Sequence, residues 1–158
     1  MHSIERESQA RLFRHAVGDS QLRALARTAM RLTGAVGVAV GVIANGSLEC
    51  VASAGERVPE VGTRVPVEQG ISGVCIRSGE LLYCRDTERD ARVNVAASRA
   101  LGIRSLAVAP LRCDEAVIGF IEVFSTTEGG FTDNEIMRFR KLAEAVAFKS
   151  AREDEQRA

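Results

Sequence analysis

The stretch from residue 64 to residue 111 most constrains the fold, because two short helices and long polar loops interrupt its strands. The first helix is expected after Gly70, which permits a tight turn, with Ser72 as the capping residue at its N-terminus. The second is expected over residues 95–101 and ends at Gly102. Long connections of this kind often form lids over functional sites. We therefore expect this stretch to cover one face of a sheet and to wall a small-molecule pocket.

Strand signals on both sides of this stretch predict an antiparallel sheet. Over residues 36–44, valines alternate with small residues such as Gly37 and Gly41, so the two faces of this strand differ. We expect a helix to approach the face with the small residues closely. The Asn45-Gly46 pair is a strong signal for a type I′ hairpin. Further strands are predicted over residues 47–53, 81–86, 105–111 and 116–125.

Helical periodicity marks both ends of the chain. Leucine and alanine recur at three- and four-residue steps over residues 22–32, and Asp19 or Ser20 can cap this helix. Gly18 separates it from an earlier helix. A capping box that begins at Thr132 starts the last helix.

Together these elements predict the α+β class. We expect a central antiparallel sheet with the N- and C-terminal helices on one face, and with short helices and loops over a pocket on the other. The chain divides into an N-terminal helical extension (residues 1–20), one domain (residues 21–152) and a charged tail (residues 153–158). The apolar stripes of the terminal helices are longer than one sheet face needs. They either cover the sheet alone or also form a helical bundle in a homodimer.

Composition excludes several classes of function. Lys+Arg and Asp+Glu are balanced at 21 each, so no charge field attracts nucleic acid or an anionic membrane. We find no apolar run of about 20 residues and no signal peptide, and we expect a cytoplasmic protein. The 4 cysteines lack C-x-x-C spacing and there are only 2 histidines, so no zinc site is expected and the thiols are expected to be reduced.

The first group of candidate ligand-binding residues is Ser72, Gly73 and Cys75, expected in the first turn of the helix after Gly70. Free backbone N–H groups and the positive helix end could hold a carboxylate or phosphate there. The same placement would lower the pKa of the Cys75 thiol. In the alternative interpretation, Ser72 only caps the helix and Cys75 is a small core residue.

A second group lies at strand ends beside the expected lid. Arg85 and Asp86 end one strand, and Arg104 and Ser105 begin another. Polar groups at such positions can converge on a pocket. Equally, the charged members of this group could form ion pairs that hold the lid loop.

Glu122 is the third candidate. In a strand of period two it shares an apolar face with Ile118, Phe120 and Phe124. A carboxylate on such a face needs a partner. It could bind an amine or guanidinium of a ligand, or pair with one of the central arginines.

Four segments resemble the GAF domain family, small sensory modules of signalling proteins. They are RVPVEQGISGVCIRSGELLYCRDTERDARV, ALGIRSLAVAPLR, AVIGFIEVFS and FTDNE, in this order. The resemblance covers roughly residues 22–151 and implies the GAF fold. It leaves the cofactor or ligand unknown, because GAF relatives bind cyclic nucleotides, bilins, haem or amino acids. Since GAF proteins commonly dimerise through terminal helices, it also favours a homodimer with a signalling-protein partner.

The residues that usually bind the known ligands of the family are mostly missing from this sequence. His2 and His15, the possible haem ligands, lie in the N-terminal helix, and no bilin motif is found. FTDNE is the only segment that resembles the signature of the cyclic-nucleotide-binding members.

We predict a non-catalytic cytoplasmic sensory module that binds a small ligand. One alternative is a structural dimerisation module with a filled pocket, and another is a thiol-based redox sensor using Cys75 and Cys84. A third is an enzyme like the GAF-like reductases of free methionine sulfoxide, which resemble the Gly73-Val74-Cys75 segment. The other working cysteines of that group would fall near Val65 and residues 94–99, which carry no thiol here.

Overall fold

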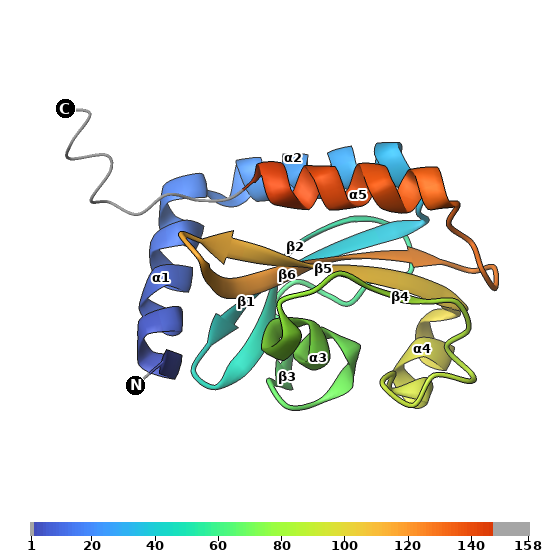
Figure 1. Cartoon of the computed structure of the whole chain (residues 1–158), viewed down its shortest axis with the longest axis horizontal. Coiled ribbons are helices and arrows are strands. Elements are labelled where there is room, and N and C mark those ends of the chain that lie inside the picture. Colours follow the sequence, from blue (N-terminus) through green and yellow to red (C-terminus); the bar gives the residue numbers. More distant parts are fainter. Residues whose placement is uncertain (1, 147–158) are drawn as a thin grey trace.

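Six strands form one antiparallel sheet with helices on both faces (Figure 1), which confirms the predicted fold class. This computed structural model describes residues 2–146, with side chains described from residue 4. The proposed end of the domain at residue 152 and the tail at 153–158 lie outside the described residues. The sheet has the strand order β3-β2-β1-β6-β5-β4. The strands are β1 (Gly37–Ala44), β2 (Ser47–Gly55), β3 (Arg64–Pro66), β4 (Leu82–Cys84), β5 (Ser105–Cys113) and β6 (Ala116–Ser125).

Helices α2 (Asp19–Thr33) and α5 (Asp133–Ala145) lie over one face of the sheet, and α1 (His2–Val17) runs along one end of the sheet with buried side chains in the same core (Figure 1). Their buried side chains meet the valine face of β1, where Val38, Val40 and Val42 point into the same core. The predicted break between α1 and α2 is confirmed, because Gly18 has a φ of 82°. The predicted cap is wrong: Gly18 itself occupies the N-cap position, with no side-chain hydrogen bond.

The start of α5 follows the predicted capping box. The Thr132 hydroxyl accepts a hydrogen bond from the backbone N–H of Glu135, and the Glu135 carboxylate accepts one from the N–H of Thr132. Both bonds satisfy donors that a helix N-terminus would otherwise leave free. Local sequence alone thus specifies where the last helix begins.

The other face carries α3 (Gly70–Ser78), α4 (Val95–Leu101) and the loops around them (Figure 1). Here the expectation about the small residues of β1 is wrong. A Cβ atom at Gly41 would lie 2.3 Å from the Phe120 ring, so this glycine makes room for an aromatic side chain and not for a helix. The hairpin after β1 is as predicted, with positive φ at both Asn45 and Gly46.

A register shift between Leu111 and Arg112 leaves Ile118 without a partner on β5, so the alternation of faces along β6 is broken at this residue. Phe120 and Phe124 lie in the core beneath α3 and α4. Ile118 lies in the core on the opposite face, contrary to the strict period of two that the sequence suggested. Glu122 keeps its predicted position between the two phenylalanines.

The short edge strand β3 has no counterpart in the sequence-based prediction. Its three residues are all exposed, so no alternation of apolar and polar residues marks it. It pairs with the start of β2, with Leu48 opposite Val65 and Glu49 opposite Arg64. This pairing places the entry to the residue 64–111 stretch beside the β1–β2 hairpin.

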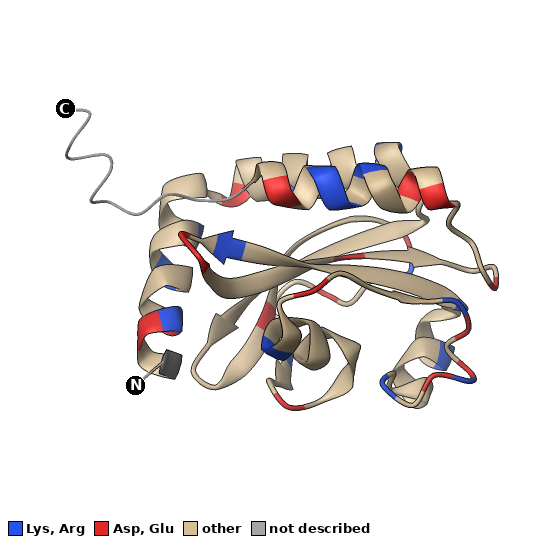
Figure 2. Ribbon diagram, in the orientation of Figure 1, with Lys and Arg blue, Asp and Glu red and all other residues tan. Residues whose placement is uncertain are grey.

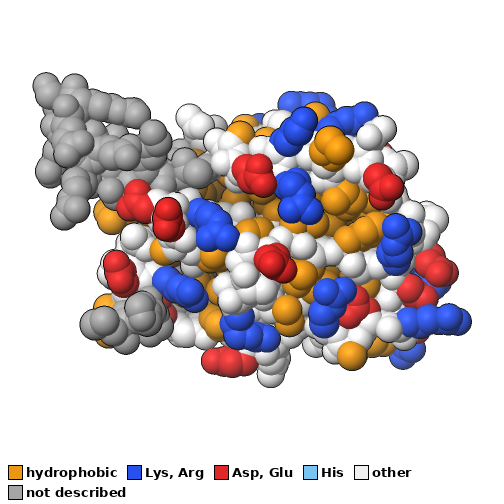
Figure 3. All heavy atoms as spheres, viewed as in Figure 1, with side chains coloured by type: hydrophobic (Ala, Val, Ile, Leu, Met, Phe, Trp, Pro, Cys, Tyr) orange, Lys and Arg blue, Asp and Glu red, His pale blue; other side chains and the backbone are white. Residues whose placement is uncertain are grey.

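Charged side chains are distributed over helices and loops (Figure 2). On the face drawn in Figure 3, acidic and basic side chains are interspersed with small apolar areas. None of the described helices has the length and apolar character needed to cross a membrane.

Candidate functional site

A cavity of about 190 Å³ lies between the sheet and the α3–α4 side. It is smaller than the pockets that hold drug-sized ligands. Much of its wall is apolar: Leu48, Ile71, Ile103, Leu106, Phe120 and Phe124. Its polar lining includes Thr63, Gln69, Ser72, Asn94, Ser98 and Glu122. The predicted pocket beneath the lid stretch is therefore present.

Ser72 lines this cavity, but it does not cap α3. The helix begins at Gly70, Gln69 is in the N-cap position, and no side chain caps the helix. Ser72 instead shares the cavity lining with Glu122, where hydrogen bonding by its hydroxyl favours the charged form of the carboxyl. The first residues of α3, from Gly70 to Ser72, thus face the same space as that carboxylate.

Glu122 is the only charged residue lining the cavity within the described part of the chain. Its side chain is nearly enclosed, since the residue is 8% exposed. Burial raises the pKa of its carboxyl to about 7, and the Ser72 hydrogen bond opposes that rise. The predicted pairing with a central arginine is wrong: among the described residues, no ion pair includes Glu122.

The structure places Gly73 and Cys75 outside the cavity lining. A Cβ atom at Gly73 would lie 2.3 Å from the backbone oxygen of Val67, so this glycine lets the preceding turn pack on α3. Cys75 lies in the second turn of the helix, fully buried. This burial agrees with the alternative interpretation of Cys75 as a small core residue: burial and the nearby Glu122 charge raise the pKa of its thiol to about 12 instead of lowering it.

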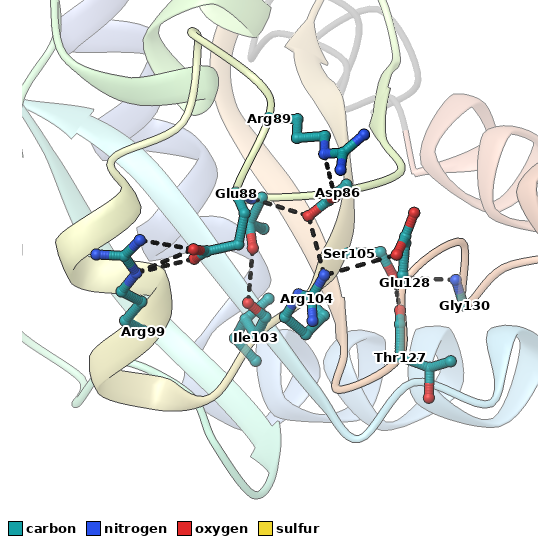
Figure 4. Close-up of polar contacts among 11 residues, drawn as sticks. Asp86, Glu88, Arg89, Arg99, Ile103, Arg104, Ser105, Thr127, Glu128 and Gly130 are labelled. Carbon is teal, nitrogen blue, oxygen red and sulfur yellow. Dashed lines mark hydrogen bonds and ion pairs between the residues drawn. The ribbon is translucent and has the colours of Figure 1, made fainter.

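The strand-end residues lie at the base of the lid loop, away from the cavity lining (Figure 4). The Arg104 guanidinium lies 3.2 Å from the Asp86 carboxylate and 3.6 Å from the Glu128 carboxylate. The Ser105 hydroxyl donates to the Thr127 carbonyl at 2.6 Å. Arg85 lies over the ring of Tyr83, 5.1 Å from its centroid. These contacts agree with the structural alternative, in which the charged residues hold the lid loop.

Several cavity-lining residues were not among the main ligand-binding candidates, and from the sequence Asn94 and Ser98 are expected chiefly in turns and helix caps. Cys50 lines the cavity from β2, and burial raises the pKa of its thiol to about 11. Asn94 also lines it while its side chain accepts a hydrogen bond from the Ala97 N–H and caps α4. Asn94 directly precedes the predicted helix, where asparagine is a common capping residue, but the position of Asn94 at the cavity depends on how α4 docks.

A second hollow, of about 360 Å³, opens between α1 and α3 and is rimmed by charged residues. Two of its three arginines already have partners: Arg112 donates to the carbonyls of Gly79 and Glu115, and Arg77 donates to the carbonyl of Val67. We therefore take the cavity beneath α3 and α4 as the candidate site. Within the described residues, no cluster of three or more His, Cys, Asp or Glu side chains could hold a metal ion.

Comparison with known families agrees with this architecture. The GAF domain family matches residues 19–148, which is most of the chain. The chain belongs to the GAF domain family. No curated protein matches it closely enough to add a specific role.

Solved structures similar to this GAF domain include both enzymes and sensors. Free methionine-R-sulfoxide reductase from Neisseria meningitidis, in complex with its substrate, is 21% identical with a TM-score of 0.69, covering 81% of this chain and 74% of that one. The type II enzyme from Thermoplasma acidophilum is 18% identical with a TM-score of 0.64, covering 90% and 99%. The GAF-B domain of DevS from Mycobacterium smegmatis is 25% identical with a TM-score of 0.63, covering 78% and 85%. Such likenesses support the fold and leave the specific role open.

Proposed function

We propose that this GAF domain is a non-catalytic regulatory module that holds a small ligand in the cavity beneath α3 and α4. The observation that carries the proposal is the buried Glu122 carboxyl, which faces this cavity without an ion-pair partner among the described residues. A polar group in such a place costs stability unless something binds it. Protein stability alone would favour an apolar residue there, so a ligand partner explains the carboxyl better.

The route from the cavity to the terminal helices runs through the β2–β3 edge of the sheet. Leu48 and Cys50 line the cavity from β2, and Glu49 between them points to the other face. There the Glu49 carboxylate lies 3.1 Å from the guanidinium of Arg14 on α1 and 2.8 Å from that of Arg64 on β3.

Like Glu49, Arg64 lies between two residues that line the cavity, Thr63 and Val65. A ligand that shifts this edge would shift the Arg14–Glu49–Arg64 ion pairs, and α1 with them. We propose this as the output of ligand binding, a differential contact of the kind that population shift requires.

Homodimerisation through the terminal helices remains part of the proposal. Ile4 and Leu12 on α1 and Met137 on α5 are large apolar side chains that stay exposed. The outer face of α2, however, carries the exposed residues Arg23, Arg27 and Arg31. A dimer would therefore use α1 and α5, and light scattering of the full chain at high concentration should give twice the monomer mass.

The second candidate function is thiol chemistry, because two similar structures are methionine-R-sulfoxide reductases. A reactive cysteine needs an accessible thiolate. Cys75 and Cys84 are fully buried, and the pKa of each thiol is raised to about 12. These properties favour binding without catalysis. Turnover of free methionine-R-sulfoxide with a thioredoxin system would overturn the non-catalytic proposal.

Native mass spectrometry of the purified full chain tests ligand binding. We expect a retained small molecule that dissociates on denaturation. Ala97→Phe, at an exposed position of α4 that lines the cavity, should abolish the retained mass. Ala100→Phe, on the same helix but outside the lining, is the matched control. Equal retention by both variants would contradict binding in this cavity.

A further inference from the structure

We propose that the ligand is a small monoamine, with an apolar body, no anionic group and an ammonium group that binds the Glu122 carboxylate. This inference rests on the proposed function and names the chemical class of its ligand.

The charge of the cavity favours a cation. Glu122 contributes a carboxylate that is 8% exposed, and no lysine, arginine or histidine among the described residues lines the space around it. Among the described residues, the Ser72 hydroxyl is the one group assigned a hydrogen bond to it, which leaves further acceptor positions on the carboxylate for a ligand. An ammonium group supplies three donors and a compensating charge at that point.

The wall of the cavity favours an apolar body. Phe120 and Phe124 stand on either side of Glu122 on β6, and Ile71 and Leu106 add aliphatic surface. Aromatic side chains beside a carboxylate also suit a cation, because their ring faces attract positive charge. The remaining polar lining is neutral, so a ligand anion would find no cationic side chain to bind.

The volume limits the ligand to a short chain. A cavity of about 190 Å³ holds roughly six groups of the size of a water molecule, at about 30 Å³ each. Isopentylamine, with five carbons and one nitrogen, is of this size. Leucine is the same molecule with a carboxylate added, and isopentanol has a hydroxyl in place of the amine, so the three compounds isolate each feature.

Titration of Glu122 should appear in the affinity. The ionisable groups that face it are Cys50 from β2 and Cys75 from α3, whose thiols have pKa values of about 11 and 12. From the adjacent strands it faces the uncharged Ala39 of β1 and Val108 of β5. Near neutral pH the Glu122 carboxyl is thus the group that changes charge.

Isothermal titration of the full chain with isopentylamine, isopentanol and leucine tests the proposal. We expect the amine to bind at least about tenfold more tightly than the other two compounds at pH 8, as a hydrogen-bonded charge pair implies. Its affinity should fall about tenfold between pH 8 and pH 6, because a carboxyl with a pKa of about 7 becomes protonated over that range. Glu122→Gln should remove the preference for the amine, while Glu115→Gln, at the exposed β5–β6 turn, should retain it.

Each other outcome would overturn the inference in a distinct way. Equal binding of isopentanol would show a cavity that selects shape and not charge. Tighter binding of leucine would assign the first turn of α3 to a carboxylate and make the ligand an amino acid. If none of the three binds, the monoamine class is wrong, and native mass spectrometry separately decides whether the cavity holds any ligand. The wild-type compound series and pH profile remain decisive if Glu122→Gln fails to fold.

Discussion

Ser72 on α3 and Glu122 on β6 line the same cavity, and the Ser72 hydroxyl is placed to hydrogen-bond the Glu122 carboxyl. The serine stabilises the charged form of the carboxyl, whereas burial favours the neutral form. The two effects leave a group that changes charge near neutral pH at the wall of the candidate site. The first two predictions concern this pair.

Replacing Glu122 with glutamine is expected to stabilise the protein more at pH 8 than at pH 5. Folding raises the pKa of this carboxyl from 4.5 to about 7. The contribution of the protonated Glu122 carboxyl to the free energy of unfolding is therefore fully present below pH 4.5 and is lost as the pH rises through 7. A shift of this size corresponds to on the order of 3 kcal/mol, which the neutral amide would not lose. Urea unfolding of both proteins at the two pH values measures the difference.

The matched control for this measurement is Glu115→Gln, since Glu115 is exposed in the turn between β5 and β6. Its effect on the free energy of unfolding should be small and should differ little between pH 5 and pH 8. A stability gain from Glu122→Gln that is the same at both pH values would contradict the assigned burial of the carboxyl.

Replacing Ser72 with alanine is expected to raise the pKa of Glu122 further. The hydroxyl is the one group that lowers this pKa, so its removal leaves burial unopposed. A ¹³C NMR titration of the Glu122 carboxyl measures the midpoint directly. Ser98→Ala is a suitable control, because Ser98 is buried and lines the same cavity from α4. An unchanged midpoint in Ser72→Ala would show that the hydroxyl does not bond the carboxylate.

Replacing Glu49 with alanine is expected to cost about 1–2 kcal/mol of stability and to loosen α1. Glu49 is 9% exposed and its removal leaves Arg14 and Arg64 without their shared carboxylate. The cost is moderate because both arginine side chains are 40% exposed or more. Urea unfolding measures the stability, and hydrogen exchange of α1 amides measures the loosening.

For this variant the control is Glu60→Ala, at an exposed loop position. We expect it to change neither the unfolding free energy nor the exchange of α1 by a measurable amount. If Glu49→Ala leaves α1 exchange unchanged, the β2–β3 edge does not hold that helix and the proposed output route fails.

The four cysteines are expected to be unreactive in the folded protein. All four thiols are free and buried, and burial raises the pKa of each. Labelling with a thiol reagent at pH 8 should be slow in the native protein and immediate in guanidinium chloride. Rapid native labelling of Cys75, identified by peptide mass, would instead revive the redox alternative.

Features that depend on neighbouring residues were predictable from the sequence. The Thr132–Glu135 capping box, the Asn45-Gly46 hairpin and the end of α4 at Gly102 are all present as expected. Each is specified by backbone conformation and hydrogen bonds within one turn, so no distant contact can override it easily. The exposed edge strand β3 was missed, because three exposed residues carry no such local signal.

The candidate site was predictable only in part, and the reason is the same. Glu122 was identified because a carboxyl on an apolar strand face is anomalous in any fold. The role of Ser72 was not, since it depends on which element packs opposite: Ser72 was expected to cap its own helix, yet it faces Glu122 on β6. For Cys75 and Arg104 the sequence left two interpretations open, and the structure agrees with a core cysteine and with an ion pair at the lid loop.

By itself the sequence determined most of the strands and helices along the chain, the two differently lined sides of the sheet and the presence of a carboxyl on an apolar face. Those properties follow from periodicity and capping, which act over a few residues. The tertiary structure alone decided that the Glu122 carboxyl faces a cavity, and that Asp86 and Arg104 pair at the base of the lid. Burial, and the pKa that follows from it, is a property of the surrounding side chains, and these come from segments far apart in the chain.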